Sequence, residues 1–424
     1  MNHHYDVIIV GARVAGATLA YELSTAGYEV LLVDKSEFPS DILSTHNFFN
    51  NSLKILREMG VLDKLLQTGT PLYKRAVVQF EDAVIDGEFP EVDGESECLC
   101  IRRVHLDQIL FEHAASQPRV TTIEGFRVTD VIREGDAVNG ITGVHRSGSA
   151  EQFTAKLVVG ADGRNSTLRK LVNSPQLMAV PTDYASYVGY FSGYEQEGDL
   201  HVELYKIKDK MVIVFPTSDQ LYVLGVMFPL DDQEWSDRFT ASPETAFREL
   251  VDSGFADSPL PARLRQSALD GKIRGLRGYD NDWYQGMGAG WALVGDALSF
   301  KDPAVGQGMH DALYTARILT EILSQHDNWD AEWESMAQTY RTMTETKMMP
   351  RYHMACQITK NVPFTTEQTM VNRFIAAHPE ATQAFLGMYN HALEPEQFGG
   401  VIGRLLQGSS AQVGYAEAND VSGG

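Results

Sequence analysis

Four short apolar runs stand out in the hydrophobic pattern, and each leads into a glycine or an aspartate. They occupy residues 5–10, 30–33, 157–160 and 291–294. Runs of this length without polar alternation are typical of strands buried on both faces of a parallel sheet. Between the first two runs, Ala15, Leu19 and Leu23 recur at helical spacing, and Gly27 can end the helix. Residues 5–35 therefore predict one strand–helix–strand unit, around which we expect the chain to be organised.

The middle of the chain has a different pattern. Alternating segments from Tyr184 to Met227, with turns at Lys208-Asp209 and Ser218-Asp219, predict a separate antiparallel sheet. Shorter β segments are expected at 76–97 and, as a meander, at 120–154. Helical spacing predicts helices at 51–59, 62–67, 104–116 and 244–252, one ending at Val172 and a long one after Gly308 that ends at Gln325.

The last quarter of the chain is expected to be mainly helical. Residues 330–407 are interrupted by Pro350, Pro363, Pro379 and Pro395, and the final residues, 409–424, are rich in small residues and predicted to be disordered. The order of elements indicates an α/β fold with an inserted sheet domain and a C-terminal helical region.

Composition and charge narrow the class of protein. The formal net charge is −22 at pH 7 and the pI is about 4.9, which opposes binding to nucleic acid or to an anionic membrane surface. Cys98, Cys100 and Cys356 are too few and too scattered for a disulfide framework, and no ligand cluster stands at zinc spacing, so we expect no metal. No apolar run approaches 18 residues, and the first strand begins at residue 5. We expect a cytoplasmic protein, monomeric or homodimeric.

The first turn suggests the chemistry. Gly11 allows a tight bend, Gly16 lets helix and strand approach closely, and free N–H groups at the helix N-terminus suit a pyrophosphate. Asp34 follows the glycine turn at about the sequence separation of an acidic residue that accepts hydrogen bonds from the hydroxyls of an adenosine ribose. An acidic residue there favours FAD or NAD over NADP. Arg13 replaces the middle glycine of the usual motif, and a turn without a ligand is the alternative interpretation.

Two further motifs follow buried strands far along the chain. Gly160-Ala-Asp-Gly163 and Gly295-Asp296, with Pro303 and Gly306-Gln-Gly308 behind it, stand where α/β sheets place ligands. With the first turn, in this order and spacing, they resemble the single-component FAD-dependent monooxygenases of the para-hydroxybenzoate hydroxylase type over residues 5–325. The resemblance implies a Rossmann-like FAD-binding domain (1–75, 98–180 and 273–330), a substrate-binding β-sheet domain (76–97 and 181–272) and a helical region (331–408).

The resemblance also implies roles for particular residues. Asp34 would hold the ribose, Arg103 (or else Arg102) would open the helix along FAD, and Asp296 would take a ribityl hydroxyl. Asp162 and Gly163 match a motif associated with the FAD pyrophosphate and with transient NAD(P)H binding. Backbone N–H groups at the start of the helix after Gly306 would stabilise negative charge on reduced flavin. The full set of expected cofactor-binding residues is Gly11, Ala12, Arg13, Ala15, Gly16, Asp34, Lys35, Arg102, Arg103, Asp162, Gly163, Asp296, Pro303, Gly306, Gln307 and Gly308.

The implied reaction uses NADH or NADPH to reduce FAD, after which O2 forms a flavin C4a-hydroperoxide that hydroxylates an aromatic or polyketide-like small molecule. The flavin carries this chemistry, so no catalytic side chain is assigned. His46, Tyr205 and Tyr222 are catalytic candidates, and Tyr205, His201 and Glu203 are the candidates for a base. The antiparallel sheet would supply the pocket, with Tyr187, Tyr205, Phe215 and Tyr222 as candidate lining.

Three other interpretations stay open. A reductase resembling the geranylgeranyl reductases shares the fold, and Val214-Phe-Pro216 matches part of that family's strand motif. A flavin-dependent halogenase shares the FAD motifs, although its Trp-x-Trp-x-Ile-Pro signature is missing here. A flavin-binding protein that only sequesters a ligand would bind without consuming NAD(P)H.

Overall fold

The computed structural model describes residues 4–42, 44 and 46–420. Its largest sheet confirms the predicted strand–helix–strand unit, since β1 pairs in parallel with β2 on one side and with β11 on the other. β20 and β8 extend the sheet in parallel, and β19, β9 and β10 complete it. The bounds are β1 His4–Val10, β2 Val30–Val33, β8 Val120–Ile123, β9 Phe126–Glu134, β10 Ala137–His145, β11 Ala150–Gly160, β19 Met287–Gly288 and β20 Trp291–Leu293.

Helices cover this sheet because its strands are apolar on both faces. α1 packs between α4 and α9, and α10 packs on α9. The bounds are α1 Val14–Thr25, α4 Arg103–Ala115, α5 Thr167–Leu171, α9 Gly308–Ser324 and α10 Trp329–Ile358. The meander expected at 120–154 holds for β9 to β11, whereas β8 joins the parallel sheet beside β2.

A seven-stranded sheet forms the second unit, in the order β17-β13-β16-β15-β14-β5-β6. Its neighbours are antiparallel except for the parallel pair β14 and β5. The bounds are β5 Arg75–Phe80, β6 Ala83–Glu88, β13 Tyr184–Ser192, β14 His201–Ile207, β15 Lys210–Pro216, β16 Leu221–Pro229 and β17 Ala268–Leu276. β17 crosses the boundary expected between residues 272 and 273 and lies wholly in this sheet.

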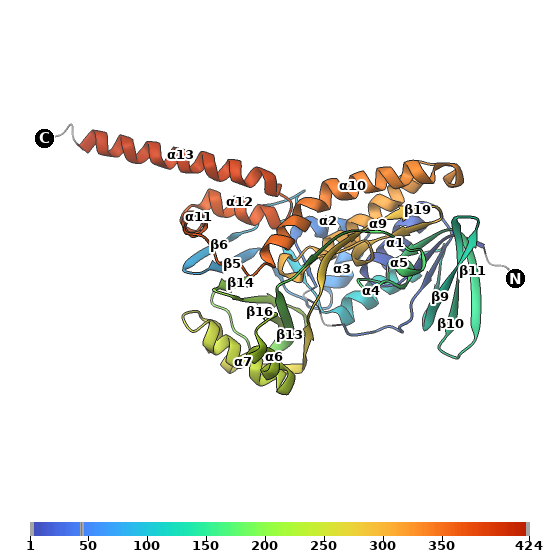
Figure 1. The fold of residues 1–424 in the computed structure, drawn as a ribbon, viewed down its shortest axis with the longest axis horizontal. Helices are drawn as coiled ribbons and strands as arrows, with labels where there is room; N and C mark the ends of the chain where they lie inside the picture. Colours follow the sequence, from blue (N-terminus) through green and yellow to red (C-terminus); the bar gives the residue numbers. More distant parts are fainter. Residues whose placement is uncertain (1–3, 43, 45, 421–424) are drawn as a thin grey trace.

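Each face of this sheet has its own cover (Figure 1). One face packs under α6 Gln233–Ala241, α7 Pro243–Gly254 and α8 Leu260–Gln266, of which only α7 was predicted. The other face packs against α11 Thr366–Ala377 and α12 Pro379–Tyr389. The faces therefore lie in different environments, and only the second is near α9.

Small elements join the two units. One three-stranded sheet contains β3 Asn47–Phe48, β7 Cys98–Cys100 and β4 Leu72–Tyr73, and another contains β12 Gln176–Pro181, β18 Asp280–Tyr284 and β21 Ser299–Phe300. α2 spans Asn50–Glu58 and α3 spans Leu62–Leu66, close to prediction. Short 3-10 turns are η1 Ser218–Gln220, η2 Gly295–Ala297 and η3 Pro303–Val305.

The helical region differs from prediction in two places. Pro350 does not interrupt a helix but lies inside α10, where Tyr340, Met348 and Tyr352 continue one buried stripe across it. α13, Pro395–Asp420, extends through most of the segment expected to be disordered. Helix-forming Ala, Gln and Glu in that segment favour the helical conformation.

Candidate functional site

The first turn has the geometry its glycines predict. Gly11 has a φ of 106°, which disfavours any side chain, and a Cβ there would lie 2.4 Å from the Ala161 carbonyl oxygen. A Cβ on Gly16 would lie 1.8 Å from the Gly11 carbonyl oxygen. Asp34 is buried at the end of β2 and accepts hydrogen bonds from the backbone N–H groups of Ala12, at 2.8 Å, and Ser36. Asp34 thus also holds the turn.

The three sequence motifs converge at the carboxyl ends of β1, β11 and β20. Gly11 lies against Ala161 of the second motif, and a Cβ on Gly295 of the third would lie 3.0 Å from the Ala15 Cβ. Asp296 follows at η2, and a Cβ on Gly308 would lie 3.7 Å from its Oδ1 atom. The start of α9 therefore meets the βαβ turn, as expected of a ligand site at this sheet edge.

Arg13 has a structural reason to replace a glycine. Its Nη1 atom donates to Asp107 Oδ2 at 2.6 Å, and Arg103 Nε donates to Asp107 Oδ1 at 2.9 Å. The Asp107 side chain is fully buried, so one carboxylate joins α4 to the first turn and fixes both arginines. Sequence reasoning missed Asp107, although its place four residues after Arg103 is an ion-pair spacing.

Arg102 points elsewhere. Its guanidinium lies 4.6 Å from the centroid of the Tyr190 ring and donates to Asp219 at 2.9 Å, while its backbone N–H donates to Ser218. Arg102 thus ties α4 to the seven-stranded sheet. Arg103 is the member of the pair whose charge acts on Asp296.

Asp162 is engaged in local structure. Its carboxylate accepts from the Ser166 hydroxyl and from the backbone N–H of Thr167, at 2.6 Å, at the start of α5. Gly163 next to it has a positive φ of 78° and open space around it. Lys35 is exposed at the end of β2.

A buried aspartate holds the loop before α9. Asp302 Oδ1 accepts from the Ala304 N–H at 2.9 Å, which caps the Pro303 turn, and Oδ2 accepts from the Tyr279 hydroxyl. Gly306 then takes a left-handed conformation, φ 66°, and a Cβ there would lie 3.0 Å from the Phe49 ring. The loop is fixed on both sides before α9 begins.

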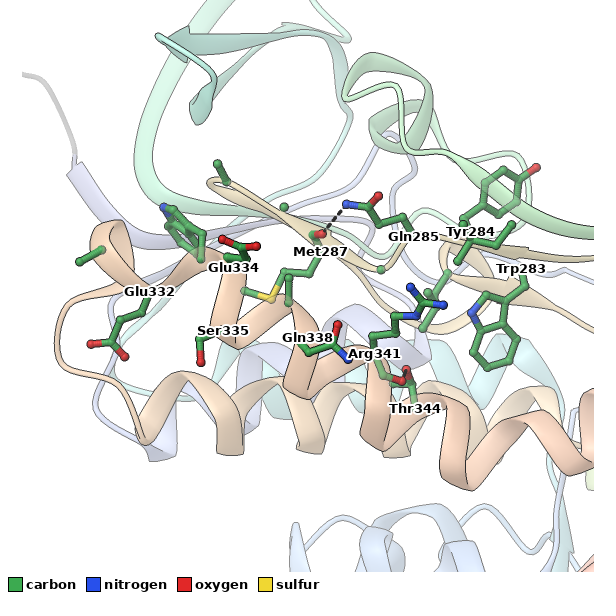
Figure 2. Close-up of a pocket in the computed structure, with 18 residues that line it drawn as sticks. Trp283, Tyr284, Gln285, Met287, Glu332, Glu334, Ser335, Gln338, Arg341 and Thr344 are labelled. Carbon is green, nitrogen blue, oxygen red and sulfur yellow. Dashed lines mark hydrogen bonds between the residues drawn. The ribbon is translucent and has the colours of Figure 1, made fainter.

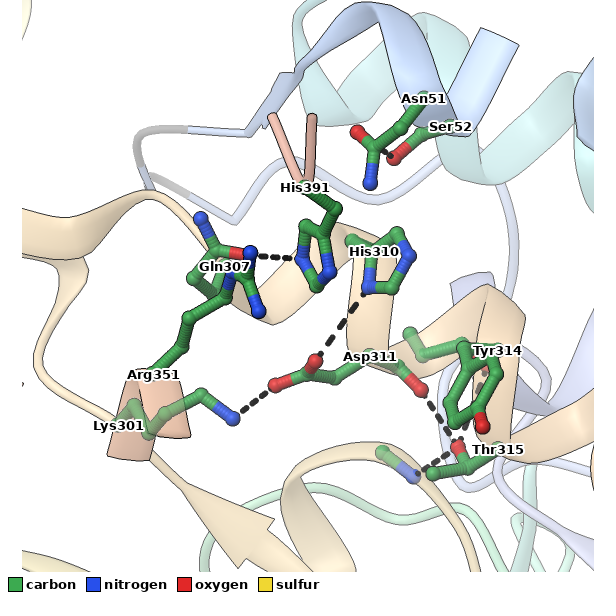
Figure 3. A network of polar contacts seen from close by, with 12 residues as sticks. Asn51, Ser52, Lys301, Gln307, His310, Asp311, Tyr314, Thr315, Arg351 and His391 are labelled. Atoms are coloured by element: carbon green, nitrogen blue, oxygen red, sulfur yellow. Dashed lines mark hydrogen bonds and ion pairs between the residues drawn. The ribbon is translucent and has the colours of Figure 1, made fainter. Parts of the chain in front are cut away.

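The C-terminal helices anchor the same loop, which the sequence did not indicate. Gln307 Nε2 donates to the backbone carbonyl of Tyr389 at 2.8 Å, and Gln307 Oε1 pairs with His391 Nε2 at 2.9 Å (Figure 3). The His391 ring lies against the His310 ring, with centroids 4.2 Å apart and planes tilted by 32°, and a buried Lys301–Asp311 ion pair lies beside them. The end of α12 therefore positions the start of α9.

A family model described as FAD binding domain matches residues 4–345. The chain belongs to the FAD binding domain family. The resemblance drawn from the three motifs, and the predicted α/β fold, are thereby confirmed.

Relatives and solved structures extend this finding. The chain is 26% identical to 6-methylpretetramide 4-monooxygenase of Streptomyces rimosus, over 81% of each chain. It is 25% identical to squalene monooxygenase 1,1 of Brassica napus, over 75% of this chain and 62% of that protein. The flavin-dependent brominase Bmp2 superposes with a TM-score of 0.78 at 19% identity, over 97% of this chain and 100% of that one. PqsL of Pseudomonas aeruginosa superposes with a TM-score of 0.63 at 19% identity, over 95% of this chain and 100% of that one. These two structural matches establish the fold alone.

The family's flavin fits the residues present. His46 Nε2 and Asn47 Nδ2 are buried polar atoms without a hydrogen-bond partner within the described part of the chain. Asn47 Nδ2 would lie 4.0 Å from a Cβ on Gly306, so it borders the glycine loop. Unpaired buried polar atoms are costly unless a ligand satisfies them. A polar ring system beside Gly306 would do so.

His46 is placed near the site but is neutral. Burial and the charges of Arg103 and Arg102 lower the pKa of His46 to about 3. At neutral pH its imidazole can therefore accept or donate one hydrogen bond but carries no positive charge.

The other candidate side chains face away from the motifs. Tyr205 and Tyr222 lie on the sheet face under α6 to α8, and Tyr187 is there too, because alternate residues of a strand point to opposite faces. Glu203 is fully buried and accepts from Tyr205, Tyr194 and Arg263, at 2.9 to 3.0 Å, so it is a structural carboxylate. Of the predicted lining, only Phe215 lies on the face near α9; Tyr190 shares that face and was missed.

Two of the pockets in the described structure bear on the placement of a ligand. The larger, about 900 Å³, lies between α10 and the β18–β20 segment, with Trp283, Met287 and Arg341 among its walls (Figure 2). None of the three motifs lines it. The smaller lies between the seven-stranded sheet, α12 and the loop at Ala304 to Gly306, with a free volume of about 40 Å³. A substrate must therefore push its walls apart.

The buried carboxylate of Asp296 makes the folding stability depend on pH. Burial raises its pKa to about 6, against the charge of Arg103. Between about pH 4, the ordinary aspartate value, and pH 6 the native protein holds a proton that the unfolded chain has lost, so stability falls as pH rises. After removal of FAD, Asp296→Asn should exceed wild type in unfolding free energy by about 2 kcal/mol at neutral pH, with little difference below pH 4. Urea unfolding at several pH values measures this; a pH-independent difference would contradict it.

Proposed function

We propose that this chain is an FAD-dependent monooxygenase that uses NADH or NADPH and O2 to hydroxylate an aromatic or polyketide-like small molecule. One observation carries the proposal: an apolar pocket borders the Ala304–Gly306 loop, which leads into Gly308 beside Asp296 of the third motif. A pocket against this loop would bring a substrate to the reactive edge of the cofactor.

The residues that would hold FAD follow from their positions. Gly11, Gly16 and the start of α1 would approach the pyrophosphate, and Asp34 would bind the ribose. Arg103, oriented by Asp107, and Asp296 would lie along the middle of the cofactor. Backbone N–H groups at Gln307 and Gly308 would face the flavin ring, where the α9 dipole favours negative charge.

Bound FAD would supply the transfer of two electrons from NAD(P)H to O2 and of one oxygen atom to the substrate. The balance is one substrate C–H, one O2, one NAD(P)H and one proton giving a C–OH, water and NAD(P)+. The chain's own contribution would be to hold the substrate at the loop and to exclude water through apolar walls.

The relatives support this assignment without fixing the substrate. The Streptomyces relative is named for oxygenation of 6-methylpretetramide, and rifampicin monooxygenase of Rhodococcus hoagii is 31% identical over 43% of this chain. No helix among the described residues is both long and apolar enough to span a membrane. The monooxygenase names of these relatives support a small molecule and O2 as the proposed partners.

Gly308→Ala tests the flavin contact separately from folding. The added methyl would meet only Asp296 Oδ1, at 3.7 Å, so the fold tolerates it, but it would project at the start of α9 where the flavin is proposed. We expect an unfolding temperature of the FAD-free protein within about 2 °C of wild type and at least about a tenfold loss of FAD affinity. Fluorescence titration with FAD measures this, and unchanged affinity would move the flavin away from Gly308.

The activity is tested by following NAD(P)H and O2 together over a panel of phenolic and polyketide-like compounds. A monooxygenase consumes both in equal amounts when a substrate is present, with little hydrogen peroxide. A reductase would turn over without O2, a halogenase would need a halide, and a sequestering protein would bind compounds without consuming NAD(P)H.

A further inference from the structure

The pocket beside the flavin loop is closed mainly by apolar and aromatic side chains from several parts of the chain. Phe49 and Phe89 flank it, β15 contributes Phe215, and α12 contributes Leu386 and Tyr389. Phe49 lies 5.3 Å from Phe89 and 6.2 Å from Tyr389 between ring centroids. Tilted rings at these distances are in direct contact, so the three side chains form one continuous aromatic wall of the pocket.

Only two of the described lining residues have polar side chains, Glu203 and Tyr389. The Glu203 carboxylate is bound by Tyr205, Tyr194 and Arg263 on the opposite face of the sheet, so it offers nothing to the pocket. Tyr389 remains as the one described lining residue whose side chain carries a hydroxyl. Its backbone carbonyl accepts from Gln307, which fixes it beside the loop.

Among the described residues that line the pocket, none has a cationic side chain. Arg102, on the same side of the sheet, lies within 4 Å of the carboxylates of Asp219, Asp41 and Asp270. Lys206 lies over the Phe364 ring, outside the lining, and Lys301 is paired with Asp311. An anionic ligand would therefore lose its hydration without gaining a counter-ion.

We propose, resting on the function proposed above, that the substrate is an uncharged aromatic compound that binds in its neutral form, with the Tyr389 hydroxyl as its one side-chain hydrogen-bond partner. The aromatic walls of the pocket select a flat ligand. The lack of a cationic side chain among the described lining residues disfavours carboxylates and sulfonates. Burial raises the pKa of Tyr389, so its hydroxyl stays protonated and can donate.

The test measures binding to the FAD-loaded protein without NAD(P)H, by calorimetry or by the perturbation of flavin absorbance. Matched probes carry hydrogen, hydroxyl or carboxylate on the same phenyl, naphthyl or biphenyl skeleton. We expect the best neutral probe to bind at least about tenfold more tightly than its carboxylate. Equal or tighter binding of the carboxylate, or no saturable binding of any neutral probe, would overturn the proposal.

Tyr389→Phe isolates the hydroxyl contact. It should weaken binding of the hydroxyl probe by about fivefold and leave the unsubstituted probe unchanged. Tyr222→Phe, on the opposite sheet face, is the control and should change neither. An unchanged hydroxyl preference in a folded Tyr389→Phe would remove Tyr389 from the proposal, and the charge preference of wild type tests the substrate class even if that variant fails to fold.

This outcome is separable from the oxygenation chemistry. Neutral probes that bind preferentially but are never oxygenated would contradict the proposed function and leave the substrate class standing. Oxygenation of a carboxylate probe, when no neutral probe binds or is oxygenated, would contradict the substrate class and leave the proposed function standing.

Discussion

Gly16→Ala should give a protein that retains no FAD and is destabilised by about 3 kcal/mol or more. The reason is steric: the added Cβ would lie 1.8 Å from the Gly11 carbonyl oxygen and 3.2 Å from the Ala161 Cβ. Backbone cannot yield there as a flexible side chain would, so α1 must move away from β1 and β11. The flavin-to-protein ratio after gel filtration and the urea midpoint measure the two effects.

Gly399→Ala is the matched control. Gly399 is also helical, in α13, but no atom lies within 4 Å of an added Cβ. It should retain FAD fully, with a stability equal to wild type or slightly higher, because alanine is the better helix former. Full FAD retention by Gly16→Ala would show that the first turn is not the pyrophosphate site.

Asp107→Asn should destabilise the protein by about 3 kcal/mol and weaken FAD binding. The fully buried carboxylate bonds to Arg13 and Arg103, and an amide leaves both cations without a compensating charge. Arg103 would then lose the orientation that directs it toward Asp296. Thermal unfolding and FAD titration on the same sample separate the stability loss from the binding loss.

Arg13→Gly provides the comparison. It restores the usual glycine of the motif and breaks only one of the two ion pairs, because Asp107 still bonds to Arg103 at 2.9 Å. Its effect should be well below that of Asp107→Asn. A larger loss in Arg13→Gly would mean that Arg13 itself contacts the cofactor.

The strand–helix–strand unit and the meeting of three motifs could be predicted because local pattern decides them. Val7 to Val10 form a buried strand on hydrophobicity alone, and Gly16 is demanded by contact with a residue five positions away. The carboxyl ends of parallel strands lie at one edge of a sheet. The motifs that contain Asp34 and Asp296 are therefore brought together at that edge.

The faces of the seven-stranded sheet could not be predicted in the same way. Alternation shows that Tyr205 and Leu204 point to opposite sides, but not which side meets the cofactor. The strand of Tyr205 has covers on both faces, α6 to α8 on one and α12 on the other, and two of those helices were not recognised. Tyr205 and Tyr222 were therefore proposed for a site that they do not border.

The contribution of the C-terminal helices to the site also could not be predicted from the sequence. Gln307 bonds to Tyr389, 82 residues away, through a backbone carbonyl that leaves no side-chain signal. Asn390 similarly donates to Asn50 and to the Pro90 carbonyl, which joins α12 to α2. Such contacts arise only when the complete chain is packed.

The fate of molecular oxygen decides whether the chain is a monooxygenase. The FAD-loaded protein is supplied with NAD(P)H, isotopically labelled dioxygen and the compound that most accelerates NAD(P)H oxidation, and the product is analysed by mass spectrometry. The proposed monooxygenase should place one labelled oxygen atom in each product molecule, with one NAD(P)H oxidised per product. A product without the label, whether hydrogenated, halogenated or oxygenated from water, would contradict the account.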